Sequence, residues 1–300
     1  MLPKTMKNRI TALCLSTLCT LSAQANKSGS TPLNITSYNY KVIKNDTLKL
    51  DMYLPEIKGP KKPVVVYVHG GGFASGSHNA DYIVSFCKAV ASKGYAVAAI
   101  SYRLTMKTKG FGCNVKAKHK IKAFETASED ISYAVDFILK HKDTFNIDPD
   151  KVVLSGTSSG AEAVLHMAYN FKNNILPRKF KLAGLICMTG ALTTLENITA
   201  ETAIPTQLFH GTGDNLVPYH ISAHHFCKED EDGYLLLYGS RVIADRLKGL
   251  GKSYYLVSSI GAPHHWSSSP MNANLNDMLD FLEHDVVKAE TRQTERTIGF

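Results

Sequence analysis

The amino-acid sequence predicts an α/β fold, with a mostly parallel central sheet, an antiparallel N-terminal hairpin and helices on both faces. The first observation is a series of short apolar runs, rich in β-branched residues, that are typical of strands buried on both sides. The second is that helical segments separate these runs, as in successive βαβ units. The third is the composition, because 300 residues with 44% apolar and 20% charged side chains can bury a sizeable core.

The elements follow from the periodicity of the chain. Polar and apolar residues alternate over 38–43 and 48–54, and Asn45-Asp46 between them favours a hairpin. Apolar runs predict buried strands over 63–68, 95–101, 151–154, 182–188, 206–209 and 253–257. Amphipathic segments predict helices over 81–92, 121–141, 161–168, 235–250 and 274–288.

Residues 1–25 are predicted to be a signal peptide that lies outside the fold. Three basic residues precede an apolar stretch over 10–21, which is too short to cross a bilayer. Ala23-Gln24-Ala25 is typical of a cleavage site, so the mature chain is expected to begin after Ala25. We therefore expect a secreted or periplasmic protein.

The rest of the chain is expected to form a single domain over residues 26–288, followed by a flexible tail over 289–300. No later apolar run predicts stable membrane insertion. Loss of the three basic residues of the signal peptide lowers the formal net charge from +8 to +5, which gives no argument for a nucleic-acid partner. The lysines of 107–122 favour a solvated surface, with a rim that attracts acidic substrates as the alternative.

Four cysteines lie outside the predicted signal peptide. An oxidising compartment permits disulfides, but the sequence alone does not determine their pairing. Cys87 and Cys187 lie in apolar segments and are expected to be buried thiols. Cys113 and Cys227 lie in polar stretches and are the candidate pair.

The segment Gly156-x-Ser158-x-Gly160 lies between a predicted buried strand and a strongly helix-forming stretch. Strand, Gly-x-Ser-x-Gly and helix in succession predict a nucleophile elbow. Glycines on either side of the serine allow the close backbone approach of a sharp turn, and the helix dipole favours negative charge at its N-terminus. Taken alone, the pentapeptide also fits a glycine-rich loop without a catalytic role.

A second motif, His69-Gly70-Gly71-Gly72, follows the strand predicted over 63–68. With this motif and the serine motif, the mature chain resembles the α/β-hydrolases over nearly all of its length. More narrowly, it resembles secreted carboxylesterases with an HGGG motif, including acetyl and feruloyl esterases. The resemblance implies a serine nucleophile, Ser158, and an oxyanion hole formed by the peptide N–H groups of Gly71, Gly72 and Ser159. It implies no cofactor and no metal.

The resemblance also implies an acid and a base after later strands, in the order Ser, Asp or Glu, His. Asp214, which follows the strand predicted over 206–209, would orient the imidazole, although an aspartate in an ordinary turn is the alternative. His264 is the expected base, and the adjacent His265 remains the alternative.

One further cluster has residue types and spacings that zinc could use: His220, His224, His225 and Cys227. The sequence shows no carboxylate pattern that would orient these histidines, and the resemblance implies no metal. We expect this stretch to form a flap over the active site.

These observations predict a secreted serine carboxylic-ester hydrolase that acts through an acyl-enzyme. The resemblance suggests short or aromatic acyl groups on polysaccharides, so the expected partner is an ester substrate such as an acylated carbohydrate. A serine peptidase of the prolyl-oligopeptidase type uses the same triad and is the first alternative. A hydrolase-fold binding module without catalysis is the second, and the filled triad positions argue against it. The oligomeric state is left open.

Overall fold

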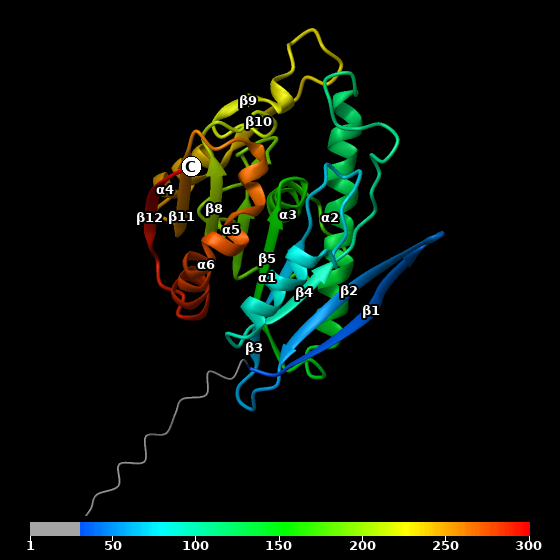
Figure 1. Ribbon diagram of the computed structural model, residues 1–300, viewed down its shortest axis with the longest axis vertical. Coiled ribbons are helices and arrows are strands. Elements are labelled where there is room, and N and C mark those ends of the chain that lie inside the picture. The colour runs from blue at the N-terminus through cyan, green and yellow to red at the C-terminus, as the bar shows by residue number, and fades with distance from the viewer. Residues whose placement is uncertain (1–30) are drawn as a thin grey trace, which may run out of the picture. The chain divides into compact units, whose positions relative to one another are not determined.

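A nine-stranded mixed sheet runs through the computed structural model, which describes residues 31–300 (Figure 1). Its strand order is β1-β2-β4-β3-β5-β6-β8-β11-β12. β1 (Leu33–Ile43) and β2 (Asp46–Pro55) form an antiparallel hairpin, β2 is antiparallel to β4, and all later neighbours are parallel. The predicted fold class is confirmed. The parallel strands are β3 (Lys62–Val68), β4 (Ala96–Ile100), β5 (Ile147–Thr157), β6 (Gly184–Met188), β8 (Thr206–Gly211), β11 (Tyr254–Ile260) and β12 (Gln293–Gly299).

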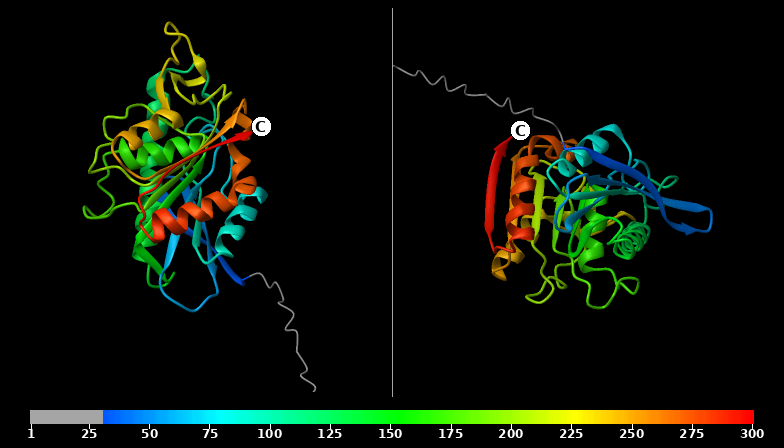
Figure 2. Two further views of the ribbon diagram at one scale, coloured as in Figure 1. Left: turned by 90° about the vertical axis from the view of Figure 1, so that its left-hand side faces the viewer. Right: turned by 90° about the horizontal axis from the view of Figure 1, so that it is seen from below.

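Helices cover both faces of this sheet, because side chains alternate along each strand and present an apolar surface on either side. In β3, Val64 and Val66 belong to the core beneath α2, α3 and α4, whereas Val65 and Tyr67 belong to the core beneath α1 and α6. Figure 2 shows the two helical layers on opposite sides of the sheet. The helices are α1 (Asp81–Ala91), α2 (Ala117–Lys140), α3 (Ser159–Tyr169), α4 (Ser240–Gly249), α5 (Pro270–Ala273) and α6 (Leu275–Phe281), which continues into a π-helical turn over Leu282–Val287.

The helix predicted over 235–250 is wrong in its first part. Leu236–Gly239 form strand β10, which pairs on one side with β9 (Ile221–Ala223) and on the other with β7 (Ala191–Leu192) in a separate three-stranded sheet. Helix α4 begins only at Ser240. The apolar run there fits either period, and pairing with two distant segments decides in favour of the strand.

The flexible tail expected over 289–300 is also corrected, because residues 293–299 form β12 at the edge of the main sheet. Glu295 accepts hydrogen bonds from Arg241 (2.9 Å) and Tyr254 (2.6 Å). These bonds lower the pKa of Glu295 to about 2. Ion pairs and strand pairing therefore order a segment that its polar composition indicated to be mobile.

Residues 1–25, for which a signal peptide is predicted, lie outside the described residues. Between residues 31 and 300, no helix combines the length and hydropathy needed to cross a bilayer.

Candidate active site

The carboxyl ends of β3, β5, β8 and β11 meet at one edge of the sheet, where ligand sites of open α/β sheets form. The segments that follow these four strands carry, respectively, the glycine run from Gly70, Ser158, Asp214 and His264. Three of these, the glycine run, Ser158 and His264, line a pocket of about 500 Å³. The fold thus assembles candidate residues that are separated by up to two hundred positions in the chain.

Ser158 sits in a sharp turn between β5 and α3, with φ 53° and ψ −123°. This left-handed conformation is rare for a residue with a side chain and is typical of strained functional positions. The turn needs its glycines: a Cβ at Gly160 would lie 2.2 Å from the carbonyl oxygen of Val68, and one at Gly156 would lie 2.5 Å from the carbonyl carbon of Gly160. The amide of Ser158 donates to the Met188 carbonyl at 2.8 Å, which fixes the turn to β6.

A continuous hydrogen-bonded series joins the three candidate triad residues. Oγ of Ser158 lies 2.8 Å from Nε2 of His264, and Nδ1 of His264 lies 2.8 Å from Oδ2 of Asp214. An ionised carboxylate only accepts hydrogen bonds, so Nδ1 carries the ring proton and Nε2 is free to accept from the serine hydroxyl. The imidazole is therefore held in the tautomer that a general base requires.

Asp214 is buried and bonded through both oxygens. Its Oδ1 accepts from the amides of Leu216 (2.8 Å) and Val217 (2.9 Å), while Oδ2 faces His264. Burial raises the pKa of Asp214, but the hydrogen bond with His264 and the neighbouring imidazole charges outweigh that effect and hold the pKa below its ordinary value. The carboxylate is thus ionised at neutral pH and can stabilise a protonated His264.

The ambiguity between the two adjacent histidines is resolved by geometry. The ring of His264 faces Ser158, whereas His265 is exposed at the pocket rim and its ring packs edge-on against Phe300. Pro263 precedes the pair in an extended conformation, which restricts the loop that presents His264.

The glycines of the HGGG motif turn their backbone toward the same pocket. Gly71 (φ 120°) and Gly72 (φ 61°) adopt conformations that favour glycine, and the amides of Ala74 and Ser75 donate back to the Gly71 carbonyl at 3.0 Å each. Within residues 31–300, the amides of Gly71, Gly72 and Ser159 make no backbone hydrogen bond to a carbonyl. Their N–H groups are therefore available to a negatively charged oxygen beside Ser158.

Sequence reasoning missed Glu162, which lies one helical turn after Ser158 on α3 and lines the same pocket. Its side chain is buried, and that burial raises its pKa to about 8. His224 lies opposite, with Nε2 3.3 Å from Oε1 of Glu162, and burial lowers the pKa of His224 to about 3. One feature of the sequence could have identified this residue: Glu162 is the only Asp, Glu, Lys or Arg in α3.

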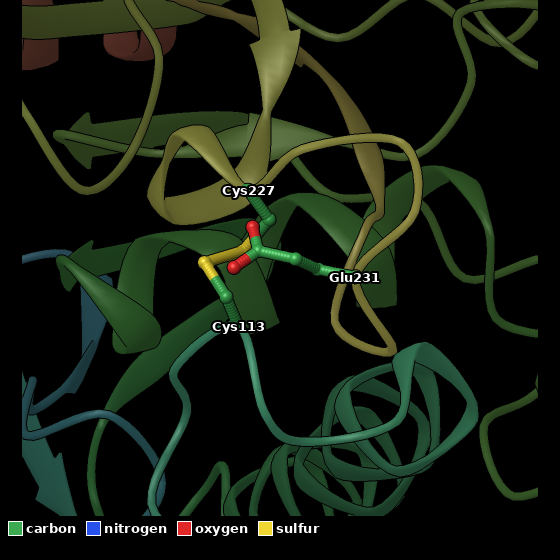
Figure 3. A group of neighbouring side chains, drawn as sticks. All are labelled: Cys113, Cys227 and Glu231. Atoms are coloured by element: carbon green, nitrogen blue, oxygen red, sulfur yellow. A yellow bond between two sulfur atoms is a disulfide. The ribbon is translucent and has the colours of Figure 1, made fainter.

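The residues considered for zinc do not come together as ligands. His220 is exposed, His224 and His225 line the pocket, and Cys227 forms a disulfide with Cys113. Figure 3 shows that disulfide beside Glu231. A cysteine binds a metal as its thiolate, and the bond consumes both sulfurs, so neither Cys113 nor Cys227 can be a metal ligand.

The disulfide joins the two segments that carry the pocket residues Phe111 and His225. Cys113 follows the pocket residue Phe111 by two positions, and Cys227 follows His225 by two. Beneath the bond, Lys120 is fully buried and donates to the Gly233 carbonyl at 2.9 Å. Lys120 is thus an exception to the solvated surface expected for the lysines of 107–122.

Comparison with known proteins agrees with this architecture. A family model described as BD-FAE matches residues 50–183. Gut esterase 1 of Caenorhabditis elegans is 32% identical over 120 residues, which cover 40% of this chain and 20% of that protein. Neutral cholesterol ester hydrolase 1 of Bos taurus is 31% identical over 139 residues, which cover 44% of this chain and 30% of that protein. The matched part of the chain thus spans less than a third of either relative.

Solved structures extend the likeness over most of the fold. The propionate-bound esterase Est2 of Thermogutta terrifontis has a TM-score of 0.60 and 21% identity, covering 85% of this chain and 94% of that one. The unliganded form of the same esterase has a TM-score of 0.58, again at 21% identity, covering 85% of this chain and 94% of that one. With the strand order above, these likenesses show that the chain has the α/β-hydrolase fold.

Proposed function

We propose that this chain is a serine carboxylic-ester hydrolase that acts through an acyl-enzyme. One observation carries the proposal: the hydrogen-bonded series Ser158–His264–Asp214 opens into a pocket whose wall presents three backbone N–H groups. An activated hydroxyl beside oxyanion donors is the arrangement that acyl transfer needs.

The reaction follows from the geometry. Nε2 of His264 takes the hydroxyl proton as Oγ of Ser158 attacks the ester carbonyl, and Asp214 stabilises the imidazolium that forms. The carbonyl oxygen gains negative charge and is bound by the N–H groups of Gly71, Gly72 and Ser159. Loss of one such donor typically lowers kcat by about 10²- to 10³-fold. His264 then protonates the departing alcohol, and a water molecule, deprotonated by His264, hydrolyses the acyl-enzyme.

The relatives, the size of the pocket and the two motifs support a substrate class. The curated matches carry the names of esterases and a cholesterol ester hydrolase, and the structural neighbour was solved with propionate. A pocket of about 500 Å³ suits a short or aromatic acyl group. We extend the proposal to acyl groups carried by polysaccharides, on the resemblance of the two motifs to those of acetyl and feruloyl esterases.

We also propose that the protein is exported. The basic, apolar and A-x-A segments of residues 1–25 support this, and so does the disulfide between Cys113 and Cys227, because such bonds persist in oxidising compartments.

Hydrolysis of a substrate panel tests the proposed activity. The panel contains 4-nitrophenyl esters from acetate to octanoate, acetylated xylan, a feruloyl ester and a dipeptidyl 4-nitroanilide. We expect hydrolysis of the esters, with the shorter acyl chains preferred, and no cleavage of the anilide. Cleavage of the anilide alone would identify a peptidase, and inertness toward the whole panel would contradict the proposal.

A further inference from the structure

Glu162 and His224 form a polar pair in the wall of the Ser158 pocket that the proposed reaction does not use. Glu162 comes from the first turn of α3, where its amide donates to the Ser158 carbonyl at 3.0 Å. His224 comes from the segment between β9 and β10, three positions before Cys227 of the disulfide. Each side chain is 2% exposed, and each lines the pocket.

Both side chains hold polar atoms without a partner. Within residues 31–300, neither Oε1 of Glu162 nor Nδ1 of His224 makes a hydrogen bond, although both atoms are buried. Oε1 lies 3.3 Å from Nε2 of His224, but the two groups are not aligned for a hydrogen bond. Buried polar groups without partners are rare in folded proteins and costly, so their presence in a pocket wall points to a ligand group that completes them.

The pair is largely neutral near pH 7. Burial and the nearby Asp214 charge raise the pKa of Glu162 to about 8, against the opposing influence of His166, His264 and Lys120. Burial and the neighbouring charge of Lys120 together lower the pKa of His224 to about 3. A protonated carboxyl group donates one hydrogen bond and still accepts, and a neutral imidazole does both.

We propose that Glu162 and His224 form a subsite for a hydroxyl group of the substrate, so that the preferred esters carry a hydroxyl on the part that occupies this side of the pocket. A hydroxyl both donates and accepts, which matches a neutral pair of this kind. A plain apolar group in the same place would leave both side chains unpaired. This inference rests on the proposed ester hydrolysis and adds the feature that selects among esters.

Charged groups fit the subsite less well. A cationic group would meet the charge of the buried Lys120 amine, and a carboxylate would meet the charge of the nearby Asp214. On one side of the pair, the edge of Phe111 packs against the His224 ring, with centroids 4.9 Å apart. An aromatic or aliphatic body that ends in a hydroxyl therefore matches the apolar contact and the polar pair together.

Two matched ester pairs test the subsite, one for each side of the scissile bond. The acyl pair is methyl 3-phenylpropionate and its 4-hydroxyphenyl analogue. The alcohol pair is 2-phenylethyl acetate and its 4-hydroxyphenyl analogue. In at least one pair, we expect kcat/KM to be about tenfold to a hundredfold higher for the hydroxylated ester, because its plain analogue leaves buried polar groups unpaired.

Variants assign that preference to the two residues. Glu162→Leu and His224→Phe should bring the ratio of kcat/KM values close to one, whereas Glu162→Gln, which can still donate and accept, should retain most of it. His220→Phe is the matched control, because His220 lies four positions before His224 but is exposed and outside the pocket lining, and its ratio should match wild type. Labelling of Ser158 by a fluorophosphonate reports that each variant is folded.

The possible outcomes distinguish failure of the subsite from failure of the proposed ester hydrolysis. Similar kcat/KM values for both members of each pair in the wild-type protein would overturn the subsite while leaving ester hydrolysis intact. A preference that survives both Glu162→Leu and His224→Phe would also overturn it. Failure of the wild-type protein to cleave any of the four esters, together with inertness on the nitrophenyl panel, would instead reject the proposed function and the subsite with it.

Discussion

Nε2 of His264 lies 2.8 Å from Oγ of Ser158, while the ring of the next residue, His265, lies against Phe300 with centroids 5.8 Å apart. Two neighbouring histidines of the same loop thus have separate environments. His264 contacts the candidate nucleophile and Asp214, and His265 remains exposed at the rim. The sequence alone left either histidine as the possible base, and a comparison of one variant at each position tests the choice made by the structure.

His264→Ala should lower kcat by about 10⁴-fold or more, because members of a triad act as a unit. His265→Ala should cost about tenfold or less and act mainly on KM, since its ring contributes only to the rim. Steady-state kinetics of both variants on one nitrophenyl ester make the comparison. If His265→Ala were the inactive variant, the role proposed for His264 would be wrong.

Ser158→Ala should abolish labelling by a fluorophosphonate and lower kcat by several orders of magnitude without changing the fold. The expected loss is large because removal of the nucleophile leaves only binding and oxyanion stabilisation. Intact-mass spectrometry after labelling and circular dichroism measure the two properties. Retention of more than about a tenth of wild-type kcat would exclude Ser158 as the nucleophile.

Replacement of Cys113 and Cys227 by serine should lower the free energy of unfolding by about 2–5 kcal/mol, because the bond closes a long loop in the unfolded chain. The two residues are separated by 114 positions. Non-reducing peptide mapping of the wild-type protein should show the linked pair, and a reductant should lower its Tm but not that of the double variant. Cys87→Ala is the control, because Cys87 is a buried free thiol and its variant should still respond to reductant. Free thiols at both positions in exported protein would contradict the bond.

Glu162→Gln should change how stability depends on pH. Burial raises the pKa of Glu162 to about 8, so between its ordinary value and pH 8 the folded protein holds a proton that the unfolded chain has released. This group therefore destabilises the fold progressively as pH rises through that window, on the order of 1 kcal/mol per pH unit.

The Gln variant does not titrate, so its stability relative to wild type should increase from pH 5 to pH 8. Urea unfolding at each pH measures the difference. Parallel pH dependence of wild type and Glu162→Gln would show that the carboxyl group is ionised throughout this range.

Local sequence was enough to predict the nucleophile turn and the strands around it. The run before Gly156 is apolar and β-branched, the run after Gly160 is helix-forming, and Gly156 is required by a contact within the turn itself. These determinants lie close together in the chain, so pattern and propensity point to the same structure.

Where the prediction from sequence was wrong, contacts between segments far apart in the chain determine the structure. The apolar run at Leu236 fits a helix until its pairing with β7 and β9 is known, and the polar residues of β12 are ordered by Arg241 and Tyr254. The place of Glu162 in the pocket was not predicted, because its partner His224 is 62 positions away. His224 lies in a segment without helical or strand periodicity. Secondary-structure propensity, which is a local property, does not report contacts between distant residues.

The disulfide also joins the two parts of the chain that carry the candidate triad. Cys113 lies on the same side of the sequence as Ser158, and Cys227 on the side of Asp214 and His264. The surface loop over 170–181 lies between them and exposes several basic residues, which trypsin-like proteases cleave. A cut in this loop would leave both fragments covalently attached and the three residues in reach of one another. The bond therefore predicts that the chain remains in one covalent piece after nicking in this loop.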